Sequence, residues 1–134
     1  MAKFPGPEWV QALVDKLNSD EKYAHTARNW EGDFRFVIEP SGSLTETLYM
    51  YVDLWHGKCR DAYLEKDESG KKPAFVLRAT YDNMKRVLTG NLDPMQAMLT
   101  RKLNVHGSMV VMMRNVPTVL DFVRCCREVT DSFV

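Results

Sequence analysis

The spacing of apolar residues changes twice along this chain, and these changes constrain its fold more than any other feature. From residue 34 to 54 apolar and polar side chains alternate, which predicts strands, and Pro40-Ser41-Gly42-Ser43 is a turn sequence between two such runs. Before this stretch, and again from residue 80, apolar residues recur every three or four positions, which predicts helices with one apolar face. Strands grouped between helices predict an α+β fold.

We expect a mostly antiparallel sheet of about five strands, with helices packed on one of its faces. Thr80, Asp93 and Ser108 should cap helices, because their side-chain oxygens can accept hydrogen bonds from the first free backbone N–H groups. Pro117 lies within the last helical pattern and should kink or split that helix. The strands are expected at 34–38, 48–54, 58–65, 75–79 and 103–107, and the helices at 7–18, 21–30, 80–89, 93–102 and 108–126.

Two local questions stay open at this stage. The strand at 58–65 can turn either Cys59 with Tyr63 or Ala62 with Leu64 towards the core, because alternate residues share one face of a strand. In the adjacent pair Cys125-Cys126, helical spacing predicts that one thiol is buried and the other half exposed.

Length, charge and motifs exclude several classes of function. With 134 residues, we expect a single domain over 1–134. Because 18 basic residues balance 18 acidic ones, no nucleic-acid partner is expected. No apolar run approaches the roughly 20 residues of a membrane helix, so we expect no stable membrane insertion and a cytoplasmic location. Nucleotide-binding, hydrolase and metal-binding motifs are lacking, so we predict no enzyme, no cofactor and no metal site.

Methionines are concentrated in one part of the chain. Six of the eight lie between Met84 and Met113. Methionine is flexible and polarizable, so it suits an apolar surface that must adapt to different contacts. We therefore expect helices bearing these residues to face the apolar side of the sheet and to enclose an apolar cavity. The candidate ligand-binding residues are Phe36, Ile38, Met50, Val52, Phe75, Leu77, Met84, Leu88, Met95, Met98, Leu99, Met109, Met112, Met113 and Leu120.

The same residues are also compatible with an ordinary, filled core, because core and pocket linings have the same composition. An arginine at the mouth of the cavity could hold a carboxylate or phosphate head group with two hydrogen bonds, and Arg28, Arg35 and Arg78 are the candidates. Each of these arginines can equally be a surface residue whose stem covers apolar area.

The segment from residue 89 to 107 resembles the sterol carrier protein type 2 family, also called the sterol-binding domain. The matching positions are Thr89-Gly90, Leu92, Asp93-Pro94, Ala97, Lys102-Leu103, Val105 and Gly107. Gly32 to Ile38, Val52-Asp53 and Gly57-Lys58 resemble earlier parts of the family pattern, and the order of elements agrees from about residue 8 to 123. Two positions depart from it: Arg101 stands where the family often has Gly, and Ser108 where it often has Asn or Asp.

This resemblance implies an apolar tunnel between sheet and helices that binds a fatty acid, an acyl-CoA, a sterol or another lipid, with the last helix as a cover. The first hypothesis is therefore a non-enzymatic intracellular lipid carrier. The alternative is an interaction or dimerisation module, or an accessory domain of a lipid or acyl-CoA enzyme, with a filled core. That alternative predicts an exposed apolar patch, for which Tyr49, Tyr51 and Trp55 are candidates, and a homodimer is one form it can take.

Overall fold

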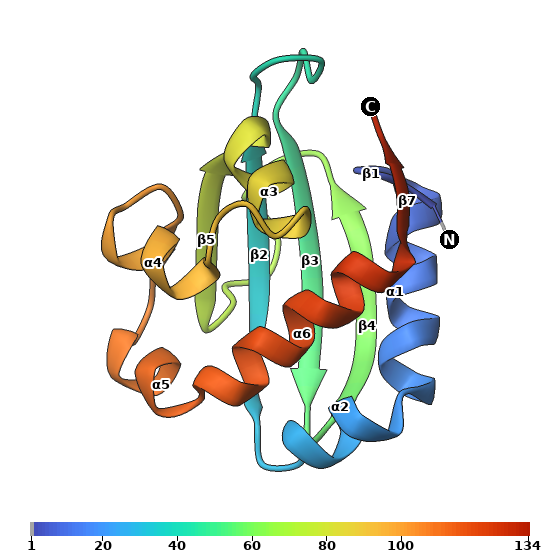
Figure 1. The fold of residues 1–134 in the computed structure, drawn as a ribbon, viewed down its shortest axis with the longest axis vertical. Coiled ribbons are helices and arrows are strands. Elements are labelled where there is room, and N and C mark those ends of the chain that lie inside the picture. The colour runs from blue at the N-terminus through green and yellow to red at the C-terminus, as the bar shows by residue number, and fades with distance from the viewer. Residues whose placement is uncertain (1) are drawn as a thin grey trace.

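A five-stranded sheet forms the centre of the computed structural model, which describes residues 2–134. Its strand order is β4-β3-β2-β5-β6, and the helices lie on one face (Figure 1). The strands are β2 (Glu31–Glu39), β3 (Leu48–Trp55), β4 (Lys58–Glu65), β5 (Phe75–Thr80) and β6 (Asn104–His106). The helices are α1 (Pro7–Ser19), α2 (Glu21–Thr26), α3 (Tyr81–Leu88), α4 (Pro94–Leu99), α5 (Met109–Arg114) and α6 (Val116–Val129). The predicted α+β fold class is confirmed.

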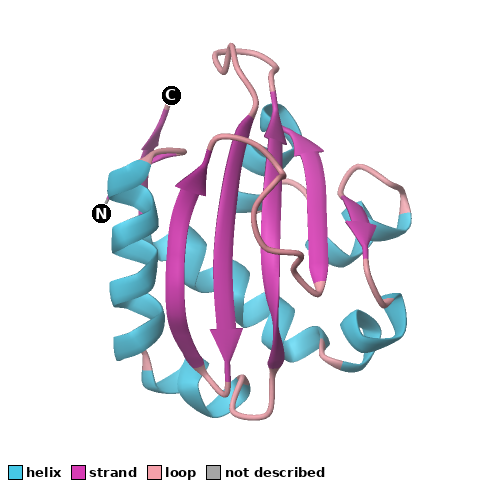
Figure 2. Ribbon diagram, turned by 180° about the vertical axis from the view of Figure 1, so that it is seen from behind, coloured by secondary structure: helices cyan, strands magenta, loops and turns pink. Residues whose placement is uncertain are grey.

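The sheet is antiparallel except at its centre, where β2 and β5 run parallel. Viewed from behind, the opposite face carries no helix and is crossed only by the loop between β4 and β5 (Figure 2). The apolar core therefore lies on one side of the sheet, between it and the helical layer. No helix within residues 2–134 is long and apolar enough to cross a membrane.

Three of the short helices begin where their capping residues predict. The side chain of Thr80 accepts a hydrogen bond from the backbone of Asn83, and Ser108 does the same for Val111. Asp93 likewise begins α4, with Pro94 as the first helical residue. These side chains satisfy N–H groups that have no partner within the helix, so each of these helices has a defined start.

A β-bulge decides the inward face of β4. The register of β3 with β4 shifts between Asp53 and Leu54. Leu54 pairs with Cys59 and Val52 pairs with Ala62, so Cys59, Ala62 and Leu64 all lie on the core side. Neither predicted pair, Cys59 with Tyr63 or Ala62 with Leu64, describes the whole core face, because the extra residue of the bulge changes which side chains share a face.

Several boundaries differ from the expected ones. The second helix ends at Thr26 instead of residue 30, because the chain turns there and brings the Trp30 N–H to the Ala27 carbonyl. The last helical pattern is split into α5 and α6, and Pro117 lies in the first turn of α6, where its missing N–H leaves no gap. Cys125 and Cys126 are both buried, so the predicted half-exposed thiol is wrong.

The structure contains one strand pair that the sequence did not predict. Residues Ala2–Phe4 form β1 and Thr130–Phe133 form β7, and these two strands pair in parallel beside α1. Phe4 contacts Trp9, Tyr81 and Phe133 through its ring, with centroid distances of 4.9, 6.3 and 6.2 Å. The two ends of the chain thus close one end of the core.

Candidate functional site

An apolar cavity of about 90 Å³ lies between the helical layer and the core face of the sheet. Strands β2, β3 and β5 supply side chains from the sheet, and α1 and α3 to α6 supply them from the helices. Its walls are formed by Phe4, Trp9, Trp30, Phe34, Phe36, Ile38, Met50, Leu54, Leu77, Met84, Val87, Leu88, Pro94, Met98, Leu103, Met112, Thr118, Val119, Phe122, Val123 and Cys126.

Aromatic rings give one side of the cavity a fixed shape. Phe34 and Phe36 on β2 stack with centroids 5.7 Å apart, and Phe122 on α6 stacks on both, at 6.4 and 5.9 Å. Trp30 and Phe75 extend this stack beyond Phe34. Stacked aromatic pairs stabilise a structure beyond the area they bury, so this wall should move little.

Methionines form the other side. Met84, Met98 and Met112 come from α3, α4 and α5, and Met50 joins them from β3. Each of these helices has only six to eight residues, and β6 lies between α4 and α5. Long, unbranched side chains on short helices can change rotamer with little strain, so this wall can adapt.

Polar groups in the lining are few and already engaged. The hydroxyl of Thr118 donates a hydrogen bond of 3.2 Å to the carbonyl of Thr26. The thiol of Cys126 is buried, and burial raises its pKa, so it remains neutral. No charged residue belongs to the lining formed by residues 2–134. The cavity can therefore accept hydrocarbon but offers no group for acid–base or nucleophilic chemistry.

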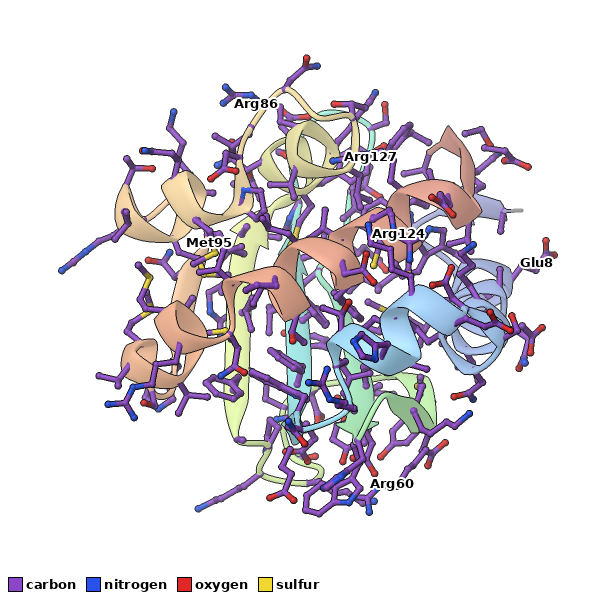
Figure 3. All side chains as sticks on the ribbon, turned by 60° about the horizontal axis from the view of Figure 1, so that its bottom comes forward. Glu8, Arg60, Arg86, Met95, Arg124 and Arg127 are labelled. Atoms are coloured by element: carbon purple, nitrogen blue, oxygen red, sulfur yellow. The ribbon has the colours of Figure 1, made fainter. Side chains whose placement is uncertain are left out.

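The structure brings eight of the predicted residues to the cavity and places the others elsewhere. Val52 and Phe75 are buried in the core but do not line the cavity, and Met95 and Met109 are half-buried and pack against the core without lining it. Figure 3 shows Met95 at the α4 side of the helical layer. The eight in the lining are Phe36, Ile38, Met50, Leu77, Met84, Leu88, Met98 and Met112.

Three predicted lining residues are exposed instead. Leu99, Met113 and Leu120 point away from the cavity, and they are among the most exposed large apolar side chains of the described structure. Leu99 and Met113 lie at or near the ends of six-residue helices, and each is rotated by about 100° around the helix axis from its buried neighbour, which takes it out of the buried face. Leu120 follows Val119, which takes the inward position on α6.

None of the three candidate arginines lies at the cavity. Arg28 is exposed and donates a 2.8 Å hydrogen bond to the His25 carbonyl. Arg35 points to the other face of the sheet, where it is buried, and Arg78 pairs there with Glu68 at 2.8 Å. Both belong to the alternate residues of β2 and β5 that face away from the helices, and strand periodicity alone shows this once the core face is known.

The patch expected for an interaction module is also absent from its predicted place. Tyr51 is only 2% exposed, because the β4–β5 loop crosses it and the Lys71 ammonium lies 5.3 Å from its ring centroid. Trp55 is partly covered by the guanidinium of Arg60, 4.5 Å from the centre of its ring. Of the three aromatic residues named for this patch, Tyr51 is therefore buried, Tyr49 is half-buried and Trp55 alone is exposed.

Sequence reasoning missed the lining residues Phe4, Trp9 and Trp30, which come from the unpredicted strand β1, from α1 and from the position just before β2. It also missed Phe122, although this residue lies one turn after Val119 on the last helix. Its spacing from Val119 and Cys126 was an available signal, since residues three and four positions apart lie on one helix face.

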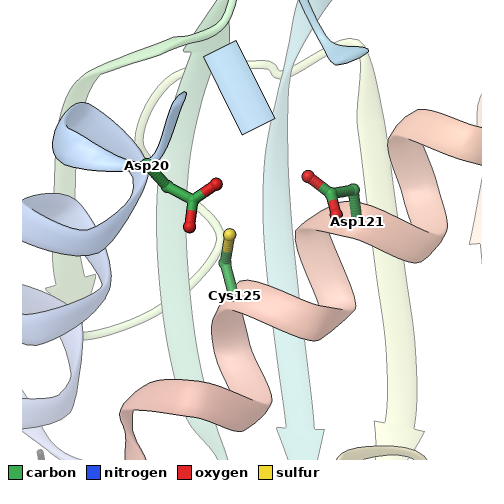
Figure 4. Close-up of side chains that lie close together, drawn as sticks. All are labelled: Asp20, Asp121 and Cys125. Atoms are coloured by element: carbon green, nitrogen blue, oxygen red, sulfur yellow. The ribbon is translucent and has the colours of Figure 1, made fainter. Parts of the chain in front are cut away.

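A second cluster of chemically active groups, formed by Asp20, Asp121 and Cys125, is shown in Figure 4. Its ligand-type atoms lie within 4.8 Å of one another. Both carboxylates are engaged by Arg124, with nitrogen–oxygen distances of 2.7 Å to each, and burial raises the pKa of the Cys125 thiol to about 11. A neutral thiol and two carboxylates paired with a guanidinium do not fit a metal ion, and the cluster instead joins α2 to α6.

The whole chain is similar to solved structures of sterol carrier proteins. A crystal structure of sterol carrier protein 2 superposes with a TM-score of 0.85 at 28% identity, covering 94% of this chain and 98% of that one. A conserved hypothetical protein of Thermus thermophilus, described as possibly a sterol carrier protein, superposes with a TM-score of 0.82 at 29% identity. That alignment covers 92% of this chain and 87% of the Thermus protein.

The same fold also occurs inside a larger protein. A sec-alkylsulfatase of Pseudomonas matches 91% of this chain with 16% of its own length, at a TM-score of 0.53 and 15% identity. Among curated proteins, none matches the chain. A family model, that of the SCP-2 sterol transfer family, matches residues 10–119. The chain therefore belongs to the SCP-2 sterol transfer family.

Proposed function

We propose that this protein is a non-enzymatic cytoplasmic carrier that holds the apolar part of a lipid between its sheet and its helical layer. The observation that carries the proposal is the cavity, whose lining carries no charge and whose polar groups are a neutral thiol, one engaged hydroxyl and the two engaged indole N–H groups of Trp9 and Trp30. Burial of hydrocarbon there would contribute about 0.8 kcal/mol per CH₂ group. Membership of a sterol transfer family supports the same reading.

The size of the cavity shapes the proposal. Its volume of about 90 Å³ is well below the roughly 300–1,000 Å³ of most ligand pockets. A lipid would therefore enlarge the cavity by moving the short helices α3 to α5 away from the aromatic wall. The methionines of these helices would follow the ligand, whereas the stacked Phe34, Phe36 and Phe122 would stay in place.

The lining also limits the ligand. Because no charged side chain of residues 2–134 reaches the cavity, a carboxylate or a coenzyme A group would have to remain at the solvent side. A fatty acid, a fatty acyl-CoA and a sterol all meet this condition, since each has one apolar part and one polar end.

The small volume favours one rival. In that reading the core is essentially filled, and the chain acts as an interaction module or as an accessory part of a lipid-processing enzyme. The occurrence of this fold within a larger sulfatase is compatible with it. The rival predicts that purified protein contains no lipid and does not take up a fatty acid.

Mass spectrometry of the native protein, with extraction and identification of bound lipid, tests the proposal directly. We also expect a fluorescent fatty acid to bind at micromolar concentration. Val119→Phe fills the cavity and should weaken this binding at least about tenfold, which corresponds to about 1.4 kcal/mol. Val110→Phe makes the same change on the exposed side of α5 and should leave the affinity unchanged. Equal affinities of the two variants, or no uptake by the wild-type protein, would exclude the carrier function.

A further inference from the structure

An arginine outside the cavity joins two of the helices that line it. Arg127, near the end of α6, donates hydrogen bonds of 3.1 and 3.3 Å from Nε and Nη2 to the backbone carbonyls of Leu88 and Val87. These carbonyls lie at the end of α3, where a helix has acceptors without partners of its own and favours a cation. Leu88, Val87 and Cys126, the residue before Arg127, all line the cavity. Arg127 therefore ties α3 to α6 from outside the cavity wall.

The seam between α3 and α6 is also where solvent comes closest to the helical side of the lining. The lining residues of α1, α4 and α5 are buried. The half-buried lining residues contributed by helices all belong to α3 and α6, and they are Met84, Val119, Phe122 and Val123. Figure 3 shows Arg127 between α6 and α3. A ligand that opens this seam would have its apolar part inside the cavity and its polar end beside Arg127.

The guanidinium of Arg127 is exposed and has no acidic partner. Within residues 2–134 it forms no ion pair, and its Nη1 has no hydrogen-bond partner there. No Asp or Glu occurs in the sequence between Asp82 and Asp93, which contains the end of α3. A guanidinium has five N–H donors and suits carboxylates and phosphates best. Two bonds to neutral carbonyls therefore leave most of the binding capacity of Arg127 unused.

The edge of Arg127 that contacts α3 is the edge with which other arginines of this protein bind carboxylates. Arg35 uses Nε and Nη2 to hold the two carboxylate oxygens of Glu65, at 2.8 and 3.0 Å. Arg60 uses the same two nitrogens for Asp53, at 3.1 and 3.2 Å. When α3 moves outward to admit a ligand, this edge of Arg127 loses its carbonyls, and a ligand carboxylate can replace both. An ester or a hydroxyl replaces them poorly, because it carries no charge.

We propose that Arg127 determines which class of lipid is carried: it holds α3 to α6 in the free protein and binds the carboxylate of a fatty acid in the complex. This inference rests on the proposed lipid carriage. The exchange of carbonyls for a carboxylate lowers the cost of opening the seam for a fatty acid only. A fatty ester, or a sterol with a single hydroxyl, opens the same seam and leaves the guanidinium with water as its main acceptor. Fatty acids are therefore the preferred cargo.

Fluorescence titration with cis-parinaric acid and with its methyl ester tests the proposal, because these two probes share one polyene chain and differ in charge. The wild-type protein should bind the acid at least about tenfold more tightly than the ester. Arg127→Met keeps an apolar stem and should bring this ratio near one, whereas Arg127→Lys should retain part of it. Arg28→Met is the matched control, because Arg28 is also exposed and also donates to a carbonyl in the last turn of a helix, α2. It should leave the ratio unchanged.

The ratio of the two affinities separates recognition of the carboxylate from a structural role. If Arg127 only holds α3 in place, Arg127→Met changes the affinities for acid and ester by the same factor, and the proposal is wrong. A wild-type ratio near one, or a ratio that is lost in Arg28→Met, also overturns it while lipid carriage stands. Failure of the wild-type protein to bind either probe overturns lipid carriage itself.

Circular dichroism shows whether each variant is folded. If Arg127→Met does not fold, the wild-type protein and Arg127→Lys still decide, because lysine keeps a donor for the α3 carbonyls but cannot form the two parallel bonds of a guanidinium. The proposal then requires a lower ratio in Arg127→Lys than in the wild-type protein, and equal ratios overturn it.

Discussion

Two buried tyrosines place their hydroxyl groups in opposite situations. Tyr81 donates a 2.9 Å hydrogen bond to the carbonyl of Val134, whereas the Tyr23 hydroxyl has no partner among the described residues. Both rings are almost completely buried, and burial raises the pKa of each phenol. An unpaired buried hydroxyl opposes folding, because it has exchanged a bond with water for none.

Replacement of each tyrosine by phenylalanine should therefore have opposite effects. Tyr23→Phe should raise the free energy of unfolding by up to about 1 kcal/mol, and Tyr81→Phe should lower it by about 1 kcal/mol. Urea denaturation of the two variants measures both changes. If Tyr23→Phe is as destabilising as Tyr81→Phe, the Tyr23 hydroxyl has a hydrogen-bond partner after all.

At the scale of elements, a buried ion pair attaches the β4–β5 loop to the sheet. Arg35 on β2 donates two hydrogen bonds to Glu65 at the end of β4, at 2.8 and 3.0 Å, and one of 2.7 Å to the Lys71 carbonyl. The two side chains are 4% and 8% exposed. Asp33 holds the far end of the same loop through the Ala74 N–H, at 2.7 Å.

Removal of one partner should leave a buried charge unpaired. We expect Glu65→Ala to lower the free energy of unfolding by about 3 kcal/mol or more, and Arg35→Met/Glu65→Leu to cost less than the single change. Glu68→Ala breaks the exposed pair with Arg78 and serves as the control, with an expected change below about 1 kcal/mol. Chemical denaturation compares the three; a double variant as unstable as Glu65→Ala would argue against an uncompensated charge as the cause.

The order and type of the main elements were predictable, because runs with a clear period and the caps at Thr80, Asp93 and Ser108 are local signals. The bulge beside Asp53 was not predictable from the sequence, since it depends on how two strands align. The β1–β7 pair has strands of three and four residues, too short to show a period. The concentration of methionines indicated which segments line the cavity. The six-residue helices α4 and α5 are too short for their apolar spacing to show which side chains turn inward.

The molecule as a whole is held together at one edge by a charge cluster. Arg124 on α6 contacts Asp20, Asp121 and Glu128, and Lys16 on α1 also reaches Asp20 at 3.1 Å. Hydrogen bonds from Arg124 and from the Tyr23 backbone hold the pKa of Asp20 well below its usual range. Because the folded pKa is depressed, this carboxylate contributes stability above the unfolded value near about 3.9, and the contribution is lost as pH falls.

The cluster should therefore make the free energy of unfolding depend on pH in the acidic range. At pH 7 we expect Asp20→Asn to lower the free energy of unfolding by about 1–2 kcal/mol, since it removes hydrogen bonds to charged groups. The difference from the wild-type protein should shrink as pH falls through about 4 and below. Asp15→Asn, on the exposed side of α1, is the control and should cause no such change. Denaturation curves at several pH values measure this difference. If the difference in free energy of unfolding between Asp20→Asn and the wild-type protein is the same at every pH, the charge of Asp20 has no role in stability.

The position of the Arg35–Glu65 pair has an evolutionary consequence. It anchors β2, β4 and the β4–β5 loop on the face of the sheet that the cavity does not use, the face seen in Figure 2. Mutations that reshape the methionine wall would leave this anchor untouched, so drift towards new cargo can proceed without loss of the scaffold. Among homologous chains we would therefore expect the buried ion pair to be retained while the residues on the other side diversify.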